Sequence, residues 1–174
     1  LLTFVGYVKF NKYYDYRYLG EIKNISNQGL EEYLKKSPYG AHYNAAYKVF
    51  QKNKIFGVGI KNFRIEGSKG IYHNEEYLFA FNKSNTHPHQ IHFEFLAETG
   101  LFGYISFLIF IFFSLFISLK YYIINKNFYQ LSSILFVLAT LIPYLPSGSF
   151  FSTFNSSVFW INYAIMMAYN KKLN

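Results

Sequence analysis

The sequence predicts an all-α integral membrane protein with one large loop outside the membrane. Its charged residues and its apolar stretches lie in different halves of the chain. All 9 acidic residues and 13 of the 17 basic residues fall at or before Glu98. Residues 101–119, by contrast, form a run of 19 residues without a charged side chain. That length is close to the ~20 apolar residues that a helix needs to cross a bilayer core.

Two further spans are predicted over residues 128–145 and 154–170. Residues 127–170 contain no charged side chain, and a stretch of this length accommodates two crossings. Pro143 and Pro146 separate the two segments. A pair of buried helices in a soluble protein is the alternative interpretation, but such helices usually keep a polar face, which these segments lack.

The polar half of the chain is predicted to lie outside the cytoplasm. Residues 1–10 are apolar but too short to span, and we expect them to end a transmembrane helix of a longer protein whose C-terminal part this sequence is. Residues 11–100 would then form one extracytoplasmic loop. Lys120, Lys126 and the pair at 171–172 would share the other side of the membrane, which the positive-inside tendency makes cytoplasmic.

The net charge of +8 alone would admit a nucleic-acid partner, but the basic residues form no dense block and alternate with acidic ones. This pattern favours a solvated surface or attraction to an anionic lipid or pyrophosphate. We therefore expect membrane lipid and no nucleic acid as partners. The sequence contains no Cys, which excludes disulfides and thiolate chemistry.

Within the loop, the sequence predicts two helices. The first is amphipathic, covers residues 41–53 and follows the start signal Ser37-Pro38. The second begins near Pro88, because proline fits a first helical turn, and Asn85 or Thr86 is expected to cap it. Glu98 would be costly deep in lipid, so we expect it to cap or pair within the protein at the membrane edge.

Three histidines, His87, His89 and His92, lie within six residues at the predicted start of this second helix. The positive end of a helix dipole keeps a nearby imidazole neutral, which suits a general base. The free N–H groups of the same helix end could also bind an anion such as pyrophosphate. Two other interpretations stay open: a metal site that Glu94 helps to complete, and a packed, purely structural role for His92.

Three motifs in order resemble those of the O-antigen ligase and O-antigen polymerase family. Residues 87–90 (His-Pro-His-Gln) and 96–103 (Leu-Ala-Glu-Thr-Gly-Leu-Phe-Gly) are similar to its His-Pro-His-Asn…Leu-Ala-Glu-x-Gly-x-x-Gly signature. Upstream, residues 55–64 resemble its Gly-x-Gly-x-x-x-Phe-Arg segment. Downstream, residues 146–152 are similar to its turn between the last spans.

The resemblance implies a metal-independent glycosyltransferase of the helical, membrane-embedded GT-C kind, without a cofactor. Its donor would be a glycan on undecaprenyl pyrophosphate, and its acceptor a sugar hydroxyl of a lipid A core or of another glycan. By motif position, His89 would activate the acceptor hydroxyl and Arg64 would bind the pyrophosphate. A guanidinium is a bidentate, permanently charged partner for phosphate oxygens. His42, His87 and Gln90 are further candidate substrate-binding residues.

Several alternatives stay open at this point. Gln90 stands where relatives more often carry Asn, and the Cys pair of many relatives is absent. Arg64 could be an ordinary loop cation, and His42 a capping or surface residue. Ligation, polymerisation and protein O-glycosylation share the motifs. A non-catalytic carrier or flippase component would need Arg64 to bind a lipid pyrophosphate but would need no base at His89, and a metal-dependent hydrolase is the third class.

Overall fold

The computed structural model describes residues 21–78 and 86–171. These residues are helical and include no β-strand, which confirms the all-α prediction, whereas the GT-C arrangement of a whole transferase stays a prediction. Residues 1–10, predicted to end a truncated helix, lie outside the described residues. The helices are α3 (Glu21–Gln28), α4 (Leu30–Lys36), α5 (Pro38–Lys52), α6 (Phe63–Glu66), the 3-10 helix η2 (Gly70–Tyr72), α7 (Ile91–Asn125), α8 (Phe128–Thr140) and α9 (Thr153–Ala168).

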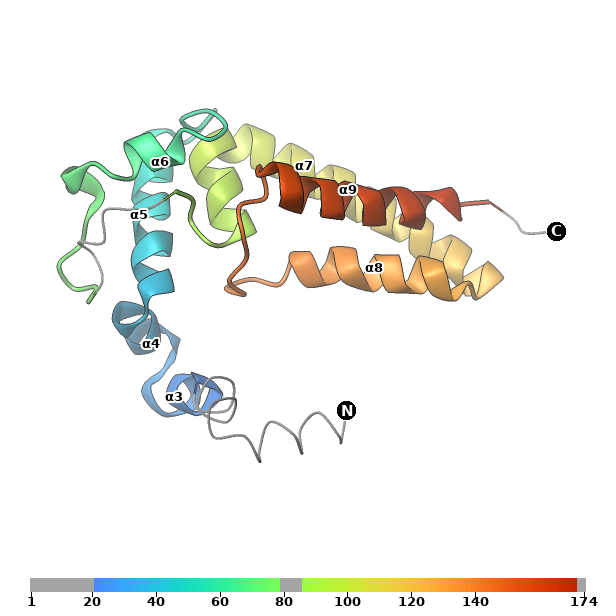
Figure 1. Ribbon diagram of the computed structural model, residues 1–174, viewed down its shortest axis with the longest axis horizontal. Coiled ribbons are helices and arrows are strands. Elements are labelled where there is room, and N and C mark those ends of the chain that lie inside the picture. Colours follow the sequence, from blue (N-terminus) through green and yellow to red (C-terminus); the bar gives the residue numbers. More distant parts are fainter. Residues whose placement is uncertain (1–20, 79–85, 172–174) are drawn as a thin grey trace.

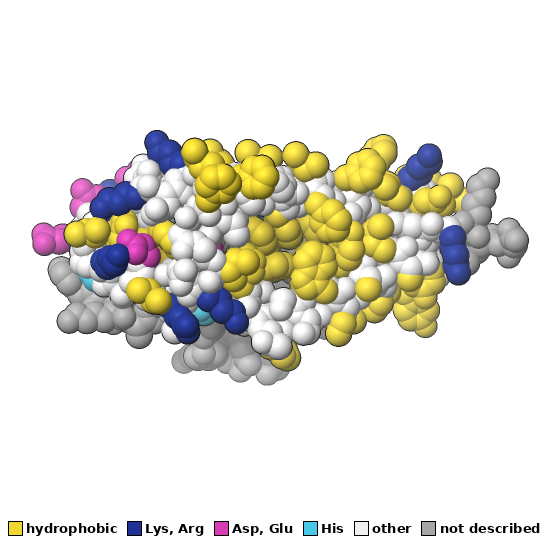
Figure 2. Space-filling model, turned by 90° about the horizontal axis from the view of Figure 1, so that it is seen from above, with side chains coloured by type: hydrophobic (Ala, Val, Ile, Leu, Met, Phe, Trp, Pro, Cys, Tyr) yellow, Lys and Arg dark blue, Asp and Glu magenta, His cyan; other side chains and the backbone are white. Residues whose placement is uncertain are grey.

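The helices form two parts (Figure 1). In one part, the long helices α7, α8 and α9 run side by side. The other part contains the shorter helices, among which α5 crosses the N-terminal end of α7. Figure 2 shows a band of hydrophobic side chains over the long helices, with mixed charges at one end and basic groups at the other. This distribution matches the charge pattern from which the membrane location was predicted.

Helix α7 carries the predicted span 101–119 and is the one described helix that is long and apolar enough to cross a membrane. It continues beyond the predicted end, to Asn125. Its outer face is apolar and exposed over several turns, for example at Phe112, Phe113 and Phe116. An apolar surface of this kind suits lipid or further helices better than water.

Helices α8 and α9 are shorter than the spans predicted over 128–145 and 154–170. Helix α8 ends at Thr140, because Pro143 has no N–H group and disfavours a helical conformation in the residue before it. Its 13 residues cover about 20 Å, less than the ~30 Å of a bilayer core. That α8 and α9 cross the membrane therefore stays a prediction.

The two helices predicted in the loop begin elsewhere than expected. Helix α5 starts at Pro38 rather than residue 41, because the Ser37 hydroxyl caps it by accepting a hydrogen bond from Tyr39 N (3.2 Å). Helix α7 starts at Ile91 rather than near Pro88, and Thr86 does not cap it. Asn85, the other expected cap, lies outside the described residues. Its N-cap is Gln90, whose Oε1 accepts hydrogen bonds from the next turn.

Helix α7 is broken at Gly100, where φ is 66° and ψ is −169°. The break divides it into an upper segment (residues 91–99) and a lower segment (residues 101–125). A docking loop (residues 54–59) lies against the break and satisfies backbone groups on both of its sides. The bonds are Val58 N to Ala97 O (3.0 Å), Gly59 N to Glu98 O (2.8 Å), Leu101 N to Lys54 O (2.8 Å) and Phe102 N to Ile55 O (3.1 Å). Interrupted helices otherwise leave such groups unpaired, which is costly in an apolar environment.

Two glycines allow the docking loop to approach this closely. A Cβ atom on Gly57 would lie 2.4 Å from the carbonyl carbon of Glu98, and one on Gly100 would lie 2.4 Å from the Ile55 carbonyl oxygen. Both glycines also have a φ of +66°. The Gly-x-Gly segment and the Leu-Ala-Glu-x-Gly segment of the sequence therefore meet backbone to backbone.

Replacing Gly57 with alanine should destabilise the protein more than replacing Gly29 does. Both positions have positive φ, but a Cβ on Gly29 would meet nothing within 4 Å. We expect Gly29→Ala to cost about 1–3 kcal/mol of backbone strain, and Gly57→Ala to cost about 2 kcal/mol more, because two docking hydrogen bonds are also lost. Thermal unfolding of the purified proteins in detergent measures this difference, and equal losses would contradict the role assigned to the docking loop.

Candidate functional site

Three of the predicted site residues, His42, His87 and His89, come together in the structure. The ring centroids of His87 and His89 are 4.0 Å apart, and those of His42 and His89 are 4.9 Å apart. Tyr39, one turn before His42 on α5, meets the His89 ring edge-on at 5.9 Å. We call His42, His87 and His89 the histidine cluster. It joins α5 to the segment that leads into α7.

The backbone of His89 is held in an unusual conformation at the centre of this cluster. Its φ is 58°, in the left-handed region that few residues other than glycine adopt. The carbonyl oxygen of His89 accepts a hydrogen bond from Ser147 N (2.8 Å), in the turn between α8 and α9. The next residue, Gln90, is buried and is fixed as the cap of α7. Strained backbone held from both sides in this way is frequent at functional sites.

The histidine cluster favours neutral imidazoles. Partial burial, followed by the effect of the neighbouring His89 and His87, lowers the pKa of His42 to about 4. Burial first, and His89 second, lowers the pKa of His87 below its ordinary value, and burial alone lowers the pKa of His89. A neutral imidazole near pH 7 has a free lone pair, so each ring can accept a proton.

The cluster also holds buried nitrogen atoms without a hydrogen-bond partner among the described residues. These are Nδ1 of His42, Nε2 of His87 and Nε2 of the adjacent Gln90. Buried polar atoms are normally satisfied, and unpaired ones at a site are available to a ligand. Neutral donors and acceptors of this kind suit the hydroxyl groups of a sugar.

Gln90, predicted to bind substrate, makes mainly structural contacts. Its Oε1 accepts hydrogen bonds from His92 N (2.8 Å) and Phe93 N (3.1 Å). The amide oxygen is therefore committed to capping α7, and only the amide nitrogen is left to face a ligand.

Arg64, the predicted pyrophosphate ligand, lies on α6 with its side chain exposed. No hydrogen bond, ion pair or ring contact among the described residues joins it to the histidine cluster. The carboxylate of Glu98 fixes the start of this short helix by accepting hydrogen bonds from Lys61 N (2.7 Å) and Phe63 N (3.3 Å). The expectation that Glu98 caps a segment within the protein is confirmed, and through Phe63 this residue anchors the helix that carries Arg64.

Glu94, the candidate fourth metal ligand, is instead bonded within the protein. Its carboxylate is buried and accepts hydrogen bonds from the Ser149 hydroxyl and from Phe150 N (2.6 Å). In residues 21–78 and 86–171, no group of three or more His, Cys, Asp or Glu side chains is arranged to hold a metal ion. The sequence did not predict that Glu94 binds the turn between α8 and α9, because its partners Ser149 and Phe150 lie far along the chain. The one sign that this turn was important was the similarity of residues 146–152 to a family motif.

His92 has the structural role that was one of its two interpretations. Its Nε2 lies 2.8 Å from the carbonyl oxygen of Leu141, and its Nδ1 lies 2.9 Å from the Tyr104 hydroxyl. A carbonyl can only accept, so Nε2 carries the proton and Nδ1 accepts from Tyr104. His92 therefore ties the end of α8 to both segments of α7 and has no free nitrogen for chemistry.

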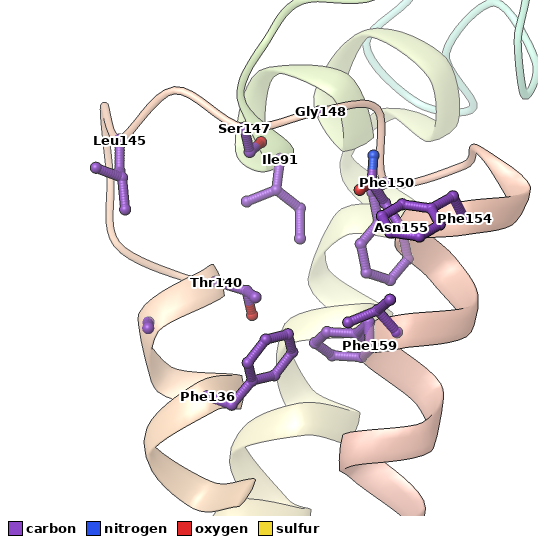
Figure 3. A pocket seen from close by; sticks show the side chains of 12 residues that line it. Ile91, Phe136, Thr140, Leu145, Ser147, Gly148, Phe150, Phe154, Asn155 and Phe159 are labelled. Atoms are coloured by element: carbon purple, nitrogen blue, oxygen red, sulfur yellow. The ribbon is translucent and has the colours of Figure 1, made fainter. Parts of the chain in front are cut away.

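A cavity of about 270 Å³ lies between α8 and α9 (Figure 3). Ile91 and Ser147 reach its upper part, and Phe136 and Phe159 line its lower part. Ser147 is the residue whose N–H group binds the His89 carbonyl. Ser147 therefore contacts both the cavity and the histidine cluster.

The comparison with protein families identifies one family. A family model described as O-antigen ligase matches residues 16–108, more than half of the chain. The matched region contains the docking loop, α6, the histidine cluster and the break in α7. No curated protein and no solved structure gives a significant match.

The lowered pKa of His42 predicts how stability depends on pH. The folded protein disfavours the protonated form of His42. The contribution of the neutral His42 to the free energy of unfolding is therefore complete above the ordinary pKa of 6.5 and is lost as the pH falls toward about 4. The melting temperature of the wild type should therefore fall between pH 7 and pH 5, and that of His42→Asn should fall less. Parallel curves for the two proteins would show that His42 is not protected from protonation.

Proposed function

The chain belongs to the O-antigen ligase family, and on this premise we propose that it transfers a glycan from an undecaprenyl-pyrophosphate carrier to a sugar hydroxyl. The reaction serves the assembly of bacterial surface polysaccharide. The acceptor hydroxyl belongs to a lipid A core or to another repeat unit, and both reactions require the same base and the same leaving group. His89 is the base in this proposal.

The observation that carries the proposal is the histidine cluster with its neutral rings and unpaired nitrogens. A sugar hydroxyl is a weak nucleophile and needs a positioned base to remove its proton. His89 occupies the centre of the cluster, with His42 and His87 on either side as partners for neighbouring hydroxyl groups. A protein that only carried a lipid pyrophosphate would have no use for such a group of bases.

In the proposed reaction, the acceptor oxygen attacks the anomeric carbon while its proton moves to the unprotonated ring nitrogen of His89. The bond between that carbon and the pyrophosphate oxygen breaks, and the lipid pyrophosphate leaves with an additional negative charge. Arg64 is proposed to bind this group, because a guanidinium stabilises developing phosphate charge without losing its proton. Its side chain is exposed on α6, and the proposal requires a ligand that bridges α6 and the cluster.

The proposal puts the histidine cluster on the periplasmic side of the bacterial inner membrane. Helix α7 gives the reference for this orientation, since its upper segment follows the cluster directly and its lower segment is the candidate span. The four lysines after Glu98 would then be cytoplasmic. A lipid-linked donor is the kind of activated sugar that is available on that side, where nucleotide sugars are absent.

Removing the base should abolish transfer. We expect His89→Ala, in the full-length protein in membranes, to reduce glycan transfer about 10²–10⁴-fold, the usual contribution of a general base. His73→Ala is the matched control, because this histidine lies outside the cluster and should keep near wild-type activity. Transfer that survives His89→Ala would favour the carrier or flippase alternative.

Arg64 can be tested by charge and by shape. We expect Arg64→Ala to raise the KM for the lipid-linked donor about tenfold or more, equivalent to ~1.4 kcal/mol of lost binding, with little effect on the KM for the acceptor. The KM of Arg64→Lys for the donor should lie between those of the wild type and Arg64→Ala, because lysine keeps the charge but loses the bidentate geometry. Lys69→Ala, which removes a cation from the same exposed region, is the control. Equal effects of Arg64→Ala and Lys69→Ala would leave Arg64 as an ordinary surface cation.

A further inference from the structure

We propose that the cavity between α8 and α9 binds the hydrocarbon chain of the lipid-linked donor next to its pyrophosphate. The inference rests on the proposed function and adds the location of the lipid. Its first support is the lining of the cavity, which is mainly apolar and aromatic: Phe136, Ala139, Leu145, Phe150, Val158 and Phe159. Such a lining suits a branched hydrocarbon and offers little to a sugar or a phosphate.

The second support is the position of the cavity. Ser147 lines it and donates its N–H group to the carbonyl of His89, and Ile91, which also lines it, follows His89 by two residues. A chain bound here would begin beside the proposed base. In the proposed reaction, only a pyrophosphate separates the donor's lipid from the reacting carbon, whereas the lipid of a lipid A acceptor is separated from its hydroxyl by sugars. The geometry therefore favours the donor's lipid.

The third support is that the wall of the cavity is fixed by polar contacts. Asn155 Nδ2 donates to the carbonyl of Ser149 (2.9 Å), and the Ser149 hydroxyl donates to the buried Glu94. A Cβ on Gly148 would lie 2.3 Å from Asn155 Nδ2, so the turn closes tightly over the top. An apolar cavity that is held open in this way leaves its lining poorly packed unless a ligand fills it.

The surroundings of the cavity are apolar as well. The two helices that line it also carry exposed hydrophobic side chains, including Leu135 and Leu138 on α8 and Phe154 and Ile161 on α9. A hydrocarbon chain can therefore leave the cavity sideways into a bilayer without crossing water. This continuity suits a long polyprenyl chain, of which only the first units would fit a volume of about 270 Å³.

Photo-crosslinking tests the inference independently of transfer. The full-length protein would carry p-benzoylphenylalanine in place of Phe154, which lines the cavity, or of Phe116, an exposed phenylalanine on the outer face of α7. Irradiation with radiolabelled undecaprenyl pyrophosphate should label position 154 about tenfold more than position 116. A tenfold difference corresponds to a binding preference of ~1.4 kcal/mol for the cavity. Equal labelling, capture of labelled phosphatidylglycerol at 154 with the same efficiency, or crosslinking of 154 to another segment of the protein would each overturn the inference.

A matched pair of variants adds a second readout. Both Ala139 and Ala164 are exposed, but Ala139→Trp adds bulk to the lining of the cavity, whereas Ala164→Trp places the same bulk on α9 outside it. We expect only Ala139→Trp to abolish labelling at position 154, and to raise the KM for the donor but not for the acceptor. Labelling that persists in Ala139→Trp would also overturn the inference.

The outcomes separate this inference from the proposed function. If His89→Ala abolishes transfer while position 154 is not labelled, the lipid site is wrong and the proposed reaction stands. If position 154 is labelled specifically and His89→Ala still transfers the glycan, the protein binds the lipid pyrophosphate here but the proposed base is wrong. Labelling in the His89→Ala background is expected to equal that of the wild type.

Discussion

The contact between the docking loop and the break in α7 positions the other segments of the candidate site. A helix that stops and restarts exposes N–H and C=O groups, and in an apolar setting no water is at hand to bind them. The backbone of residues 54–59 satisfies these groups on both sides of Gly100. The same contact turns the chain so that Glu98, just before the break, receives the start of α6. The long apolar helix and the polar loop region are thereby joined through their backbones.

The upper segment of α7 acts as the hub of the candidate site. Its first turn follows the histidine cluster, Glu94 binds the turn between α8 and α9, and Glu98 binds the start of α6. Two buried carboxylates on one short helical segment therefore set the positions of two other segments. Each is bonded to backbone N–H groups rather than to a basic side chain, so the arrangement depends on chain geometry more than on salt concentration.

The sequence was sufficient to predict what local pattern and residue chemistry determine. The all-α class, the long apolar helix after Gly100 and the capping role of Glu98 were all anticipated. The break at Gly100 was not, because a single glycine within an apolar helix is usually tolerated, and its partner Gly57 lies far away in the chain. The start of α7 at Ile91 was missed for a local reason: the left-handed conformation of His89 prevents the helix from beginning at Pro88. The partners of Glu94 belong to another hairpin, so no local pattern could reveal them.

The hydrogen bond from Ser147 N to the His89 carbonyl makes the spacing of the last helical hairpin part of the site. Thr140 ends α8, and the chain then has only a few residues in which to reach Ser147. Inserting or deleting one residue in that stretch would shift the donor N–H group along the chain and release the His89 backbone. The hairpin of α8 and α9 therefore helps to fix the backbone of His89, although it lies far along the sequence from it. Exchanging this hairpin between relatives would preserve the site only if the stretch between Thr140 and Ser147 kept its length.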